Sequence, residues 1–119
     1  MLKNITAQQA TALLDSKDTF IINIVASWCS DCVDQSKNIA DFAAYCCENK
    51  IPVYQLNVQD IKNEYLSATH EAVTMCLGGR GYPRTALIKA GIIVDADNVE
   101  VISSDALAQL AEKFIKSLK

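Results

Sequence analysis

The chain has no excess of charge of either sign and no long apolar run. Its 119 residues carry 11 basic and 14 acidic side chains, for a net charge of −3. We therefore expect neither nucleic acid nor an anionic membrane surface as a partner. No apolar run approaches the roughly 20 residues of a membrane-spanning helix, and residues 1–15 hold no continuous apolar block of the kind found in secretory signals. We expect a single domain over residues 1–119.

Histidine is scarce, and the cysteines are odd in number. His70 is the only histidine, and the five cysteines are Cys29, Cys32, Cys46, Cys47 and Cys76. An odd number fits a disulfide framework poorly, so we expect a reducing compartment, the cytoplasm. There is no second Cys-x-x-Cys and no His-x-x-x-His, so the spacing predicts no metal site, and we expect no cofactor.

Three of the cysteines are expected to be structural. Cys46 and Cys47 are neighbours on a predicted helix and point about 100° apart, so we expect no disulfide between them. Cys46 is predicted in the core and Cys47 half-buried or at the surface. Cys76 is predicted to be a small buried hydrophobe, with a regulatory thiol as the alternative.

Apolar periodicity in the first half predicts alternating helices and strands. Thr6 and Gln9 fit a capping box that opens a helix. Residues 20–25 form a short apolar run typical of a buried strand. Residues 29–48 are predicted to form one long helix, and residues 53–58 alternate as a second strand.

The second half begins with a predicted helix over residues 60–70, in which Ile61, Tyr65 and Leu66 face the core. Residues 77–83 form a loop that contains three of the four glycines.

The C-terminal part predicts a hairpin and a helix. Residues 85–89 form a strand, residues 92–94 its antiparallel return, and residues 95–98 break the run. Ser103 or Ser104 caps a last helix, whose apolar stripe is Leu107, Leu110, Phe114, Ile115 and Leu118. The order of elements predicts an α/β fold, with a mixed sheet of four to five strands covered by helices on both faces.

The pair Cys29 and Cys32 is the strongest chemical signal. Two cysteines separated by two residues at a strand-to-helix junction are typical of thiol–disulfide chemistry. Unpaired N–H groups and the helix dipole favour the thiolate at the first position. We therefore expect Cys29 to be an exposed nucleophile and Cys32, one turn deeper, to be the resolving thiol.

Two motifs together resemble the thioredoxin superfamily. Trp28-Cys29-x-x-Cys32 follows the central strand, and Arg80-Gly81-Tyr82-Pro83 precedes a strand and a Lys-x-Gly turn. The resemblance implies a thioredoxin fold, a cis peptide bond before Pro83, and substrate binding by Trp28, Tyr82 and Pro83. The alternatives are that Trp28 closes the core beneath the loop and that Pro83 is an ordinary loop proline.

Four positions depart from that family or modify its site. Ser30 replaces the proline of related Trp-Cys-Pro-Asp-Cys sites and lacks its rigid φ, so the reduction potential should differ. The carboxylate of Asp31 opposes thiolate formation and would repel acidic substrates. Asn23 stands where the family often has a buried aspartate, and Gln55 where a lysine pairs with it. An amide cannot act as a general base, so we expect slower reaction with protein disulfides or proton transfer through water.

The resemblance implies a thiol–disulfide oxidoreductase that reduces protein or small-molecule disulfides through Cys29 and Cys32. Its partners would be the disulfide substrate and a recycling reductase, and we expect a monomer. Tyr82, Arg84 and Asp31 are predicted to give the rim of the site a mixed character. The alternatives are an isomerase or oxidant, a glutathione-dependent glutaredoxin, and a redox-inactive or weakly active binding module with this fold.

Overall fold

A central strand that is buried on both faces organises the molecule. The computed structural model describes all residues from 1 to 119, and its elements in chain order are β1 (Leu2–Asn4), α1 (Ala7–Asp15), β2 (Phe20–Ala26), α2 (Ser30–Ser36), α3 (Ile39–Glu48), β3 (Val53–Gln59), α4 (Ala68–Cys76), β4 (Arg84–Lys89), β5 (Ile92–Val99) and α5 (Ser104–Ser117). β2 is apolar at six of its seven positions because helices cover both sides of it. Alternate side chains enter opposite cores: Phe20 packs on one side and Ile21 on the other.

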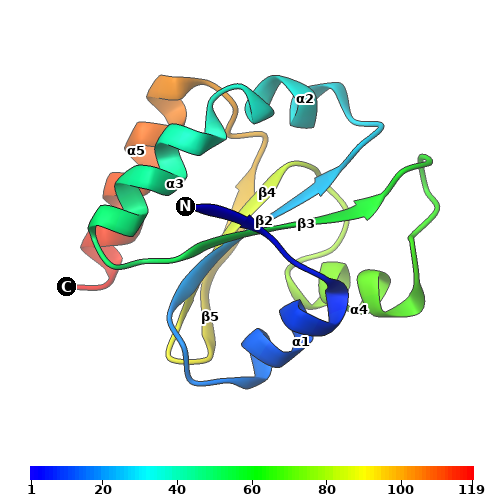
Figure 1. Cartoon of the computed structure of the whole chain (residues 1–119), viewed down its shortest axis with the longest axis horizontal. Helices are drawn as coiled ribbons and strands as arrows, with labels where there is room; N and C mark the ends of the chain where they lie inside the picture. The colour runs from blue at the N-terminus through cyan, green and yellow to red at the C-terminus, as the bar shows by residue number, and fades with distance from the viewer.

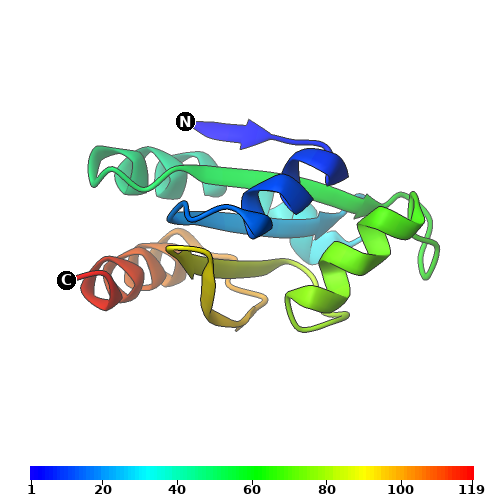
Figure 2. The same ribbon diagram turned by 90° about the horizontal axis from the view of Figure 1, so that it is seen from below.

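The strands form one mixed sheet in the order β1-β3-β2-β4-β5. β1, β3 and β2 run parallel, and β4 and β5 are antiparallel to their neighbours. This confirms the predicted mixed sheet at five strands. Figure 1 shows α3 and α5 on one side of the sheet and α1 and α4 on the other, and Figure 2 shows the same layers from below. α2 follows the carboxyl end of β2, where parallel α/β sheets commonly bind ligands.

Several local predictions are confirmed. Thr6 caps α1 through a complete capping box with Gln9. Ser103 caps α5, and its side chain accepts a hydrogen bond from the backbone N–H of Ala106. The first strand of the sheet was missed, because β1 has only three residues and follows no apolar alternation. No helix has the length and apolarity needed to cross a membrane.

The long helix expected over residues 29–48 is wrong. The structure has two helices, α2 and α3, separated at Lys37 and Asn38. The Asn38 side-chain amide donates to the carbonyl of Ile102 at 3.0 Å, and the Ser104 hydroxyl donates to its oxygen at 3.2 Å. These contacts with the start of α5 and the residues before it hold Asn38 out of helical geometry, at φ −121° and ψ −18°.

The helix expected over residues 60–70 is also wrong in its first half. Residues 60–66 form a loop, and α4 begins only after the N-cap residue Ser67. Asn63 has φ +67°, which a helix does not accept. Ile61 and Leu66 are exposed rather than facing the core, and Tyr65 is half-buried.

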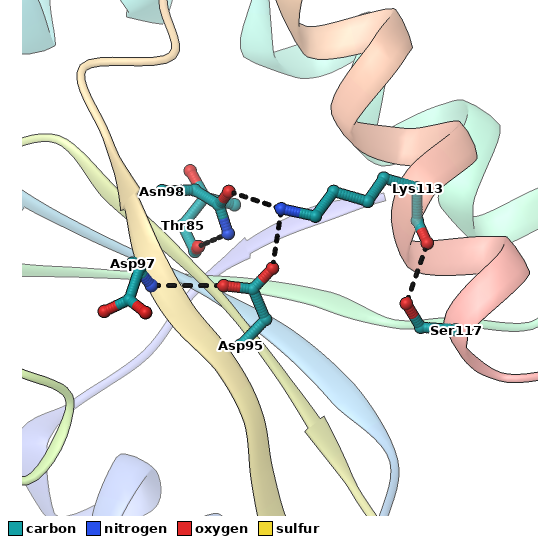
Figure 3. Close-up of polar contacts among 6 residues, drawn as sticks. All are labelled: Thr85, Asp95, Asp97, Asn98, Lys113 and Ser117. Carbon is teal, nitrogen blue, oxygen red and sulfur yellow. Dashed lines mark hydrogen bonds and ion pairs between the residues drawn. The ribbon is translucent and has the colours of Figure 1, made fainter.

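The predicted break at residues 95–98 is absent, because β5 continues through it to Val99. Figure 3 shows Lys113 of α5 reaching across to this strand, where its ammonium lies 2.9 Å from the Asp95 carboxylate and donates to the side-chain oxygen of Asn98. The Asn98 side-chain amide in turn donates to the backbone carbonyl of Thr85 at 3.3 Å. Polar residues that predict a turn are therefore held in a strand by contacts with the neighbouring helix and strand.

Candidate redox site

The two cysteines lie at the junction of β2 and α2. Cys29 is the N-cap residue of α2, and its sulfur accepts a hydrogen bond from the backbone N–H of Cys32 at 3.3 Å. The backbone N–H of Cys29 donates to Ala26 at the end of β2, which fixes the turn between strand and helix. The local sequence therefore brings the two thiols within one helical turn, and both are free.

Both sulfur-bearing side chains are buried, which corrects the expectation of an exposed Cys29. Cys29 is 7% exposed and Cys32 is 6% exposed, so the two thiols do not differ in depth as expected. The reason lies in a distant loop: the Cys29 thiol donates to the backbone carbonyl of Tyr82, with sulfur and oxygen 3.6 Å apart. Burial, together with the neighbouring Cys29, raises the pKa of Cys32 to about 12.

A hollow of about 320 Å³ opens over Cys29. It is lined by Trp28, Cys29, Ser30, Asp31, Asn63, Arg80, Gly81, Tyr82 and Glu100. Five of the predicted site residues thus meet at one place. Asp31, Arg80 and Glu100 take part in none of the ion pairs in the molecule, so both signs of charge are free at this hollow.

Other predicted residues lie elsewhere. Pro83 is buried behind Tyr82, with a cis peptide bond between the two, and does not line the hollow. Arg84 is also buried, so it is not part of the rim: its guanidinium donates to the carbonyls of Ala96 and Arg80. The cation beside the hollow is Arg80 instead.

Trp28 forms one wall of the hollow and is 36% exposed. Its indole N–H donates to the side-chain oxygen of Gln59 at 2.9 Å. Its ring meets the Tyr82 ring edge to face, with centroids 6.2 Å apart, and the Lys62 ammonium lies 5.4 Å from its centroid. These contacts hold a partly exposed aromatic surface beside Cys29.

The ring of Tyr82 packs against that of Trp28 and is itself buried. It is 8% exposed, and its hydroxyl donates to the Tyr65 hydroxyl at 3.3 Å. Burial and this hydrogen bond raise the pKa of Tyr82 well above its usual range. The phenol therefore stays neutral, and the group that Tyr82 presents to Cys29 is its backbone carbonyl.

A neutral polar network lies within the sheet next to α2. Asn23 is fully buried and donates to the side-chain oxygens of Gln35 at 2.7 Å and Gln55 at 3.0 Å. Its own oxygen accepts from the Thr85 hydroxyl at 2.8 Å and from the Gln35 amide at 3.4 Å. Every hydrogen-bonding position of the Asn23 side chain is filled, and none of its partners is charged.

Cys32 faces a second hollow, of about 300 Å³, rather than the first. It is lined by Val25, Ala26, Ser27, Cys32, Val33, Ser36, Gln55 and Asn57. All of these residues other than the cysteine lack an ionisable side chain. No carboxylate or histidine therefore lines this hollow to accept the Cys32 proton.

The other three cysteines are far from equivalent. Cys46, on α3, is fully buried in the hydrophobic core, as predicted, and burial raises its pKa to about 12. Cys47 is exposed. Cys76 is exposed as well, which corrects the prediction that it is a buried hydrophobe. No group of three His, Cys, Asp or Glu side chains is arranged to hold a metal ion.

Sequence reasoning missed Gln59, Asn63, Tyr65 and Gln35. Asn63 and Tyr65 fell inside a wrongly predicted helix, and a glutamine near the end of a strand carries no chemical signature by itself. A buried glutamine one turn after Cys32 could have been inferred from the helical spacing of Gln35.

The structure is similar to several solved thioredoxins. Thioredoxin NaTrxh from Nicotiana alata matches with a TM-score of 0.72 at 15% identity, over 99% of this chain and 93% of that one. Fasciola hepatica thioredoxin matches with a TM-score of 0.68 at 16% identity, over 94% and 98% of the two chains. The oxidised thioredoxin of Plasmodium falciparum matches with a TM-score of 0.64 at 22% identity, over 97% and 99%.

Comparison of the sequence alone adds nothing to this. No protein-family model matches the chain, and no curated protein matches its sequence. The likeness to these solved structures nevertheless covers nearly the whole length of both chains. The chain therefore has the thioredoxin fold, with a Cys29–Cys32 pair at the start of α2.

Proposed function

We propose that the protein is a thiol–disulfide oxidoreductase that reduces disulfides of proteins or small molecules through Cys29 and Cys32. The observation that carries the proposal is the position of Cys29. Its sulfur caps a helix, accepts the N–H of Cys32 and lies at the base of a hollow with an aromatic wall. The sulfur that would attack the substrate therefore accepts a hydrogen bond from the helix, and its residue lines a hollow that could receive a substrate disulfide.

The reaction has two exchange steps. In the first, the Cys29 thiolate attacks one sulfur of the substrate disulfide, the substrate S–S bond breaks, and the departing thiolate takes a proton from solvent. In the second, the Cys32 thiol loses its proton to water, and the resulting thiolate attacks the Cys29 sulfur; the mixed disulfide breaks, and the second substrate thiolate leaves and takes a proton from solvent. The substrate gains two electrons and becomes two thiols, while the protein becomes a Cys29–Cys32 disulfide.

The buried residues modulate the second step. Cys32 must lose its proton before it attacks, and burial holds that proton firmly. The Asn23 amide has no free lone pair for it, because Thr85 and Gln35 fill its oxygen. Water that enters the second hollow is then the acceptor, which favours slow resolution at neutral pH.

A complete cycle needs further partners. A recycling reductase would return the disulfide to the dithiol, and a reducing compartment such as the cytoplasm would keep it reduced. We propose that a single copy of the chain performs the exchange, because both cysteines and the hollow come from one chain.

Reduction of insulin by dithiothreitol, followed by turbidity, tests the proposal. We expect the wild-type protein to accelerate precipitation, Cys29→Ser to abolish the effect, and Cys32→Ser to accumulate a mixed disulfide with the substrate. The matched controls are Cys47→Ser and Cys76→Ser, which alter exposed thiols outside the hollow and should retain activity. If all five proteins behave alike, the proposal fails.

A second candidate function is a redox-inactive or weakly active binding module. The burial of both thiols and the neutral network around Asn23 favour it, because each slows exchange. The reduction potential of the Cys29–Cys32 pair, measured against glutathione, separates the two. A pair that equilibrates with glutathione is an oxidoreductase or isomerase, whereas a pair that never cycles is a binding module.

A further inference from the structure

One buried side chain connects the two walls of the hollow. Gln59 is the last residue of β3 and is 1% exposed. Its side-chain oxygen accepts two hydrogen bonds, from the indole N–H of Trp28 at 2.9 Å and from the backbone N–H of Asn63 at 3.1 Å. Trp28 and Asn63 both line the hollow over Cys29, whereas Gln59 does not.

The other end of the Gln59 amide has no partner. Its nitrogen is buried and makes no hydrogen bond. An unpaired buried donor is destabilising, so a side chain present only to fill space would be more stable as an apolar residue. The polar contacts of the Gln59 side chain are therefore those of its oxygen, and both donors, Trp28 and Asn63, line the hollow.

The segment that Asn63 belongs to also contacts Trp28 and its neighbour Ser27 at other points. The Lys62 ammonium lies over the Trp28 ring, and the Asp60 carboxylate accepts from the hydroxyl of Ser27 at 2.7 Å. These contacts are exposed and individually weak. Gln59 provides the buried one, and in a dry environment a hydrogen bond is both stronger and more strictly oriented.

We propose that Gln59 is a positioning residue of the proposed redox site, whose side-chain oxygen fixes Trp28 against the loop of residues 60–66 and so determines how well the hollow binds a polypeptide around its disulfide. The inference rests on the proposed function and adds a determinant of substrate binding to it. Gln59 touches neither sulfur, so the exchange reaction itself is not affected. Small disulfides, which need only reach Cys29, are affected little.

Three substitutions of Gln59 separate the effect of its acceptor oxygen from the effect of its side-chain volume. Gln59→Leu and Gln59→Met introduce an apolar side chain of similar size and remove the acceptor oxygen. Gln59→Met replaces Gln59→Leu in the experiment if Gln59→Leu does not fold. Gln59→Glu keeps an acceptor oxygen for both N–H groups; its second oxygen takes the place of the unpaired donor and, because it is buried, lowers stability without removing the contact with Trp28. Gln109→Leu is the matched control, because it makes the same chemical change at an exposed position of α5.

The decisive measurement compares two substrates. With insulin, we expect Gln59→Leu or Gln59→Met to raise KM about fivefold to tenfold, with kcat within about twofold of wild type, as loss of one to two hydrogen bonds implies. With the small aromatic disulfide dithiobis(nitrobenzoate), we expect the rate to change less than about twofold. Gln59→Glu should restore the KM for insulin, and Gln109→Leu should leave both substrates unchanged.

Trp28 supplies a second readout, because it is the only tryptophan in the chain. In Gln59→Leu or Gln59→Met its fluorescence maximum should shift to longer wavelength as the indole loses its partner and becomes more hydrated. Gln59→Glu should emit like the wild type. All variants must first be shown to unfold cooperatively in urea. A shift of the fluorescence maximum then reports a change around Trp28 and not a general loss of structure.

Two results would overturn the inference about Gln59 and leave the proposed function intact. One is an equal loss of rate with insulin and with the small disulfide, which would mean that Gln59 acts through the dithiol or through overall stability. The other is wild-type KM and fluorescence in the apolar variants. If the wild-type protein reduces neither substrate, the proposed function fails and this inference with it.

Discussion

Replacing Asn23 by aspartate exchanges one atom at the centre of the buried network. The side-chain nitrogen of Asn23 donates to the oxygens of Gln35 at 2.7 Å and Gln55 at 3.0 Å. In Asn23→Asp an oxygen takes its place, so at neutral pH the side-chain oxygens of buried Gln35 and half-buried Gln55 face a third acceptor, which carries charge. The Thr85 hydroxyl still donates to the other oxygen, as it does in the wild type.

The size of the effect follows from these contacts. Two hydrogen bonds worth about 1 kcal/mol each are lost, and the buried oxygen of Gln35 is left without this donor. The carboxylate itself is fully buried with no cation among its partners, which adds to the cost. We expect Asn23→Asp to lower the free energy of unfolding by about 3–5 kcal/mol at pH 7, a large share of the roughly 5–15 kcal/mol of a typical domain.

The cost should depend on pH in a defined direction. Burial raises the pKa of the new carboxyl in the folded state above its unfolded value. A group of this kind is least destabilising below its unfolded pKa, near about 4, and the stability is lost as the pH rises through the folded value. When protonated, the carboxyl can also donate to Gln35 or Gln55. The difference between variant and wild type should therefore shrink to about 1–2 kcal/mol near pH 4.

Urea denaturation of the wild type and of Asn23→Asp at pH 4 and pH 7 measures both quantities. Gln109→Glu, the same amide-to-carboxylate change at an exposed position of α5, is the control and should cost about 0.5 kcal/mol or less. A cost below about 1 kcal/mol at pH 7 would refute the reasoning. So would a cost that is independent of pH, because it would mean that the new carboxyl stays in contact with water.

Three further outcomes are expected. In a single turnover with dithiobis(nitrobenzoate), release of the second nitrothiobenzoate should rise about tenfold per pH unit from about pH 7 to 9, because burial raises the pKa of Cys32 to about 12; a plateau in this range would contradict it. Cys46→Ser should lower the free energy of unfolding by about 1–3 kcal/mol, since it buries a hydroxyl without a planned partner, whereas exposed Cys47→Ser should change it by less than about 0.5 kcal/mol in the same urea titration; equal costs would count against the assignment of core and surface. Partial burial raises the pKa of Asp95, but hydrogen bonds, first from Lys113, outweigh this and hold it below its usual range. The stability lost in Lys113→Met, under about 1 kcal/mol at pH 7, should therefore shrink as the pH falls through the folded pKa of Asp95, to the part that comes from the Asn98 contact; an equal loss at about pH 2 and pH 7 would exclude the ion pair as a cause.

The elements that were predicted correctly have signals within a few residues. The capping box of Thr6 and Gln9 opens α1, and the apolar stripe from Leu107 onward forms the buried face of α5. These signals are local because a helix repeats every 3.6 residues and a cap spans one turn. The spacing of Cys29 and Cys32 is a local signal of the same kind, because the two residues between them fix the distance between the two cysteines.

The elements that were predicted wrongly depend on partners far along the chain. Asn38 interrupts the helix because its side chain bonds Ile102, 64 residues away. Asp95 remains in β5 because Lys113 pairs with it. Local propensity favoured a helix in the first case and a turn in the second, and contacts with α5 or the segment before it overruled both.

The sequence by itself determined that two thiols lie one helical turn apart at the end of a buried strand, because backbone geometry and periodicity need only neighbouring residues. Only the tertiary structure decided what surrounds them. The carbonyl of Tyr82 that accepts the Cys29 thiol lies 53 residues away, and the oxygen of Gln59 that holds Trp28 lies 31 residues away. Desolvation and hydrogen bonding act through space, so the burial of both thiols and the shape of the hollow follow from the packing of distant segments.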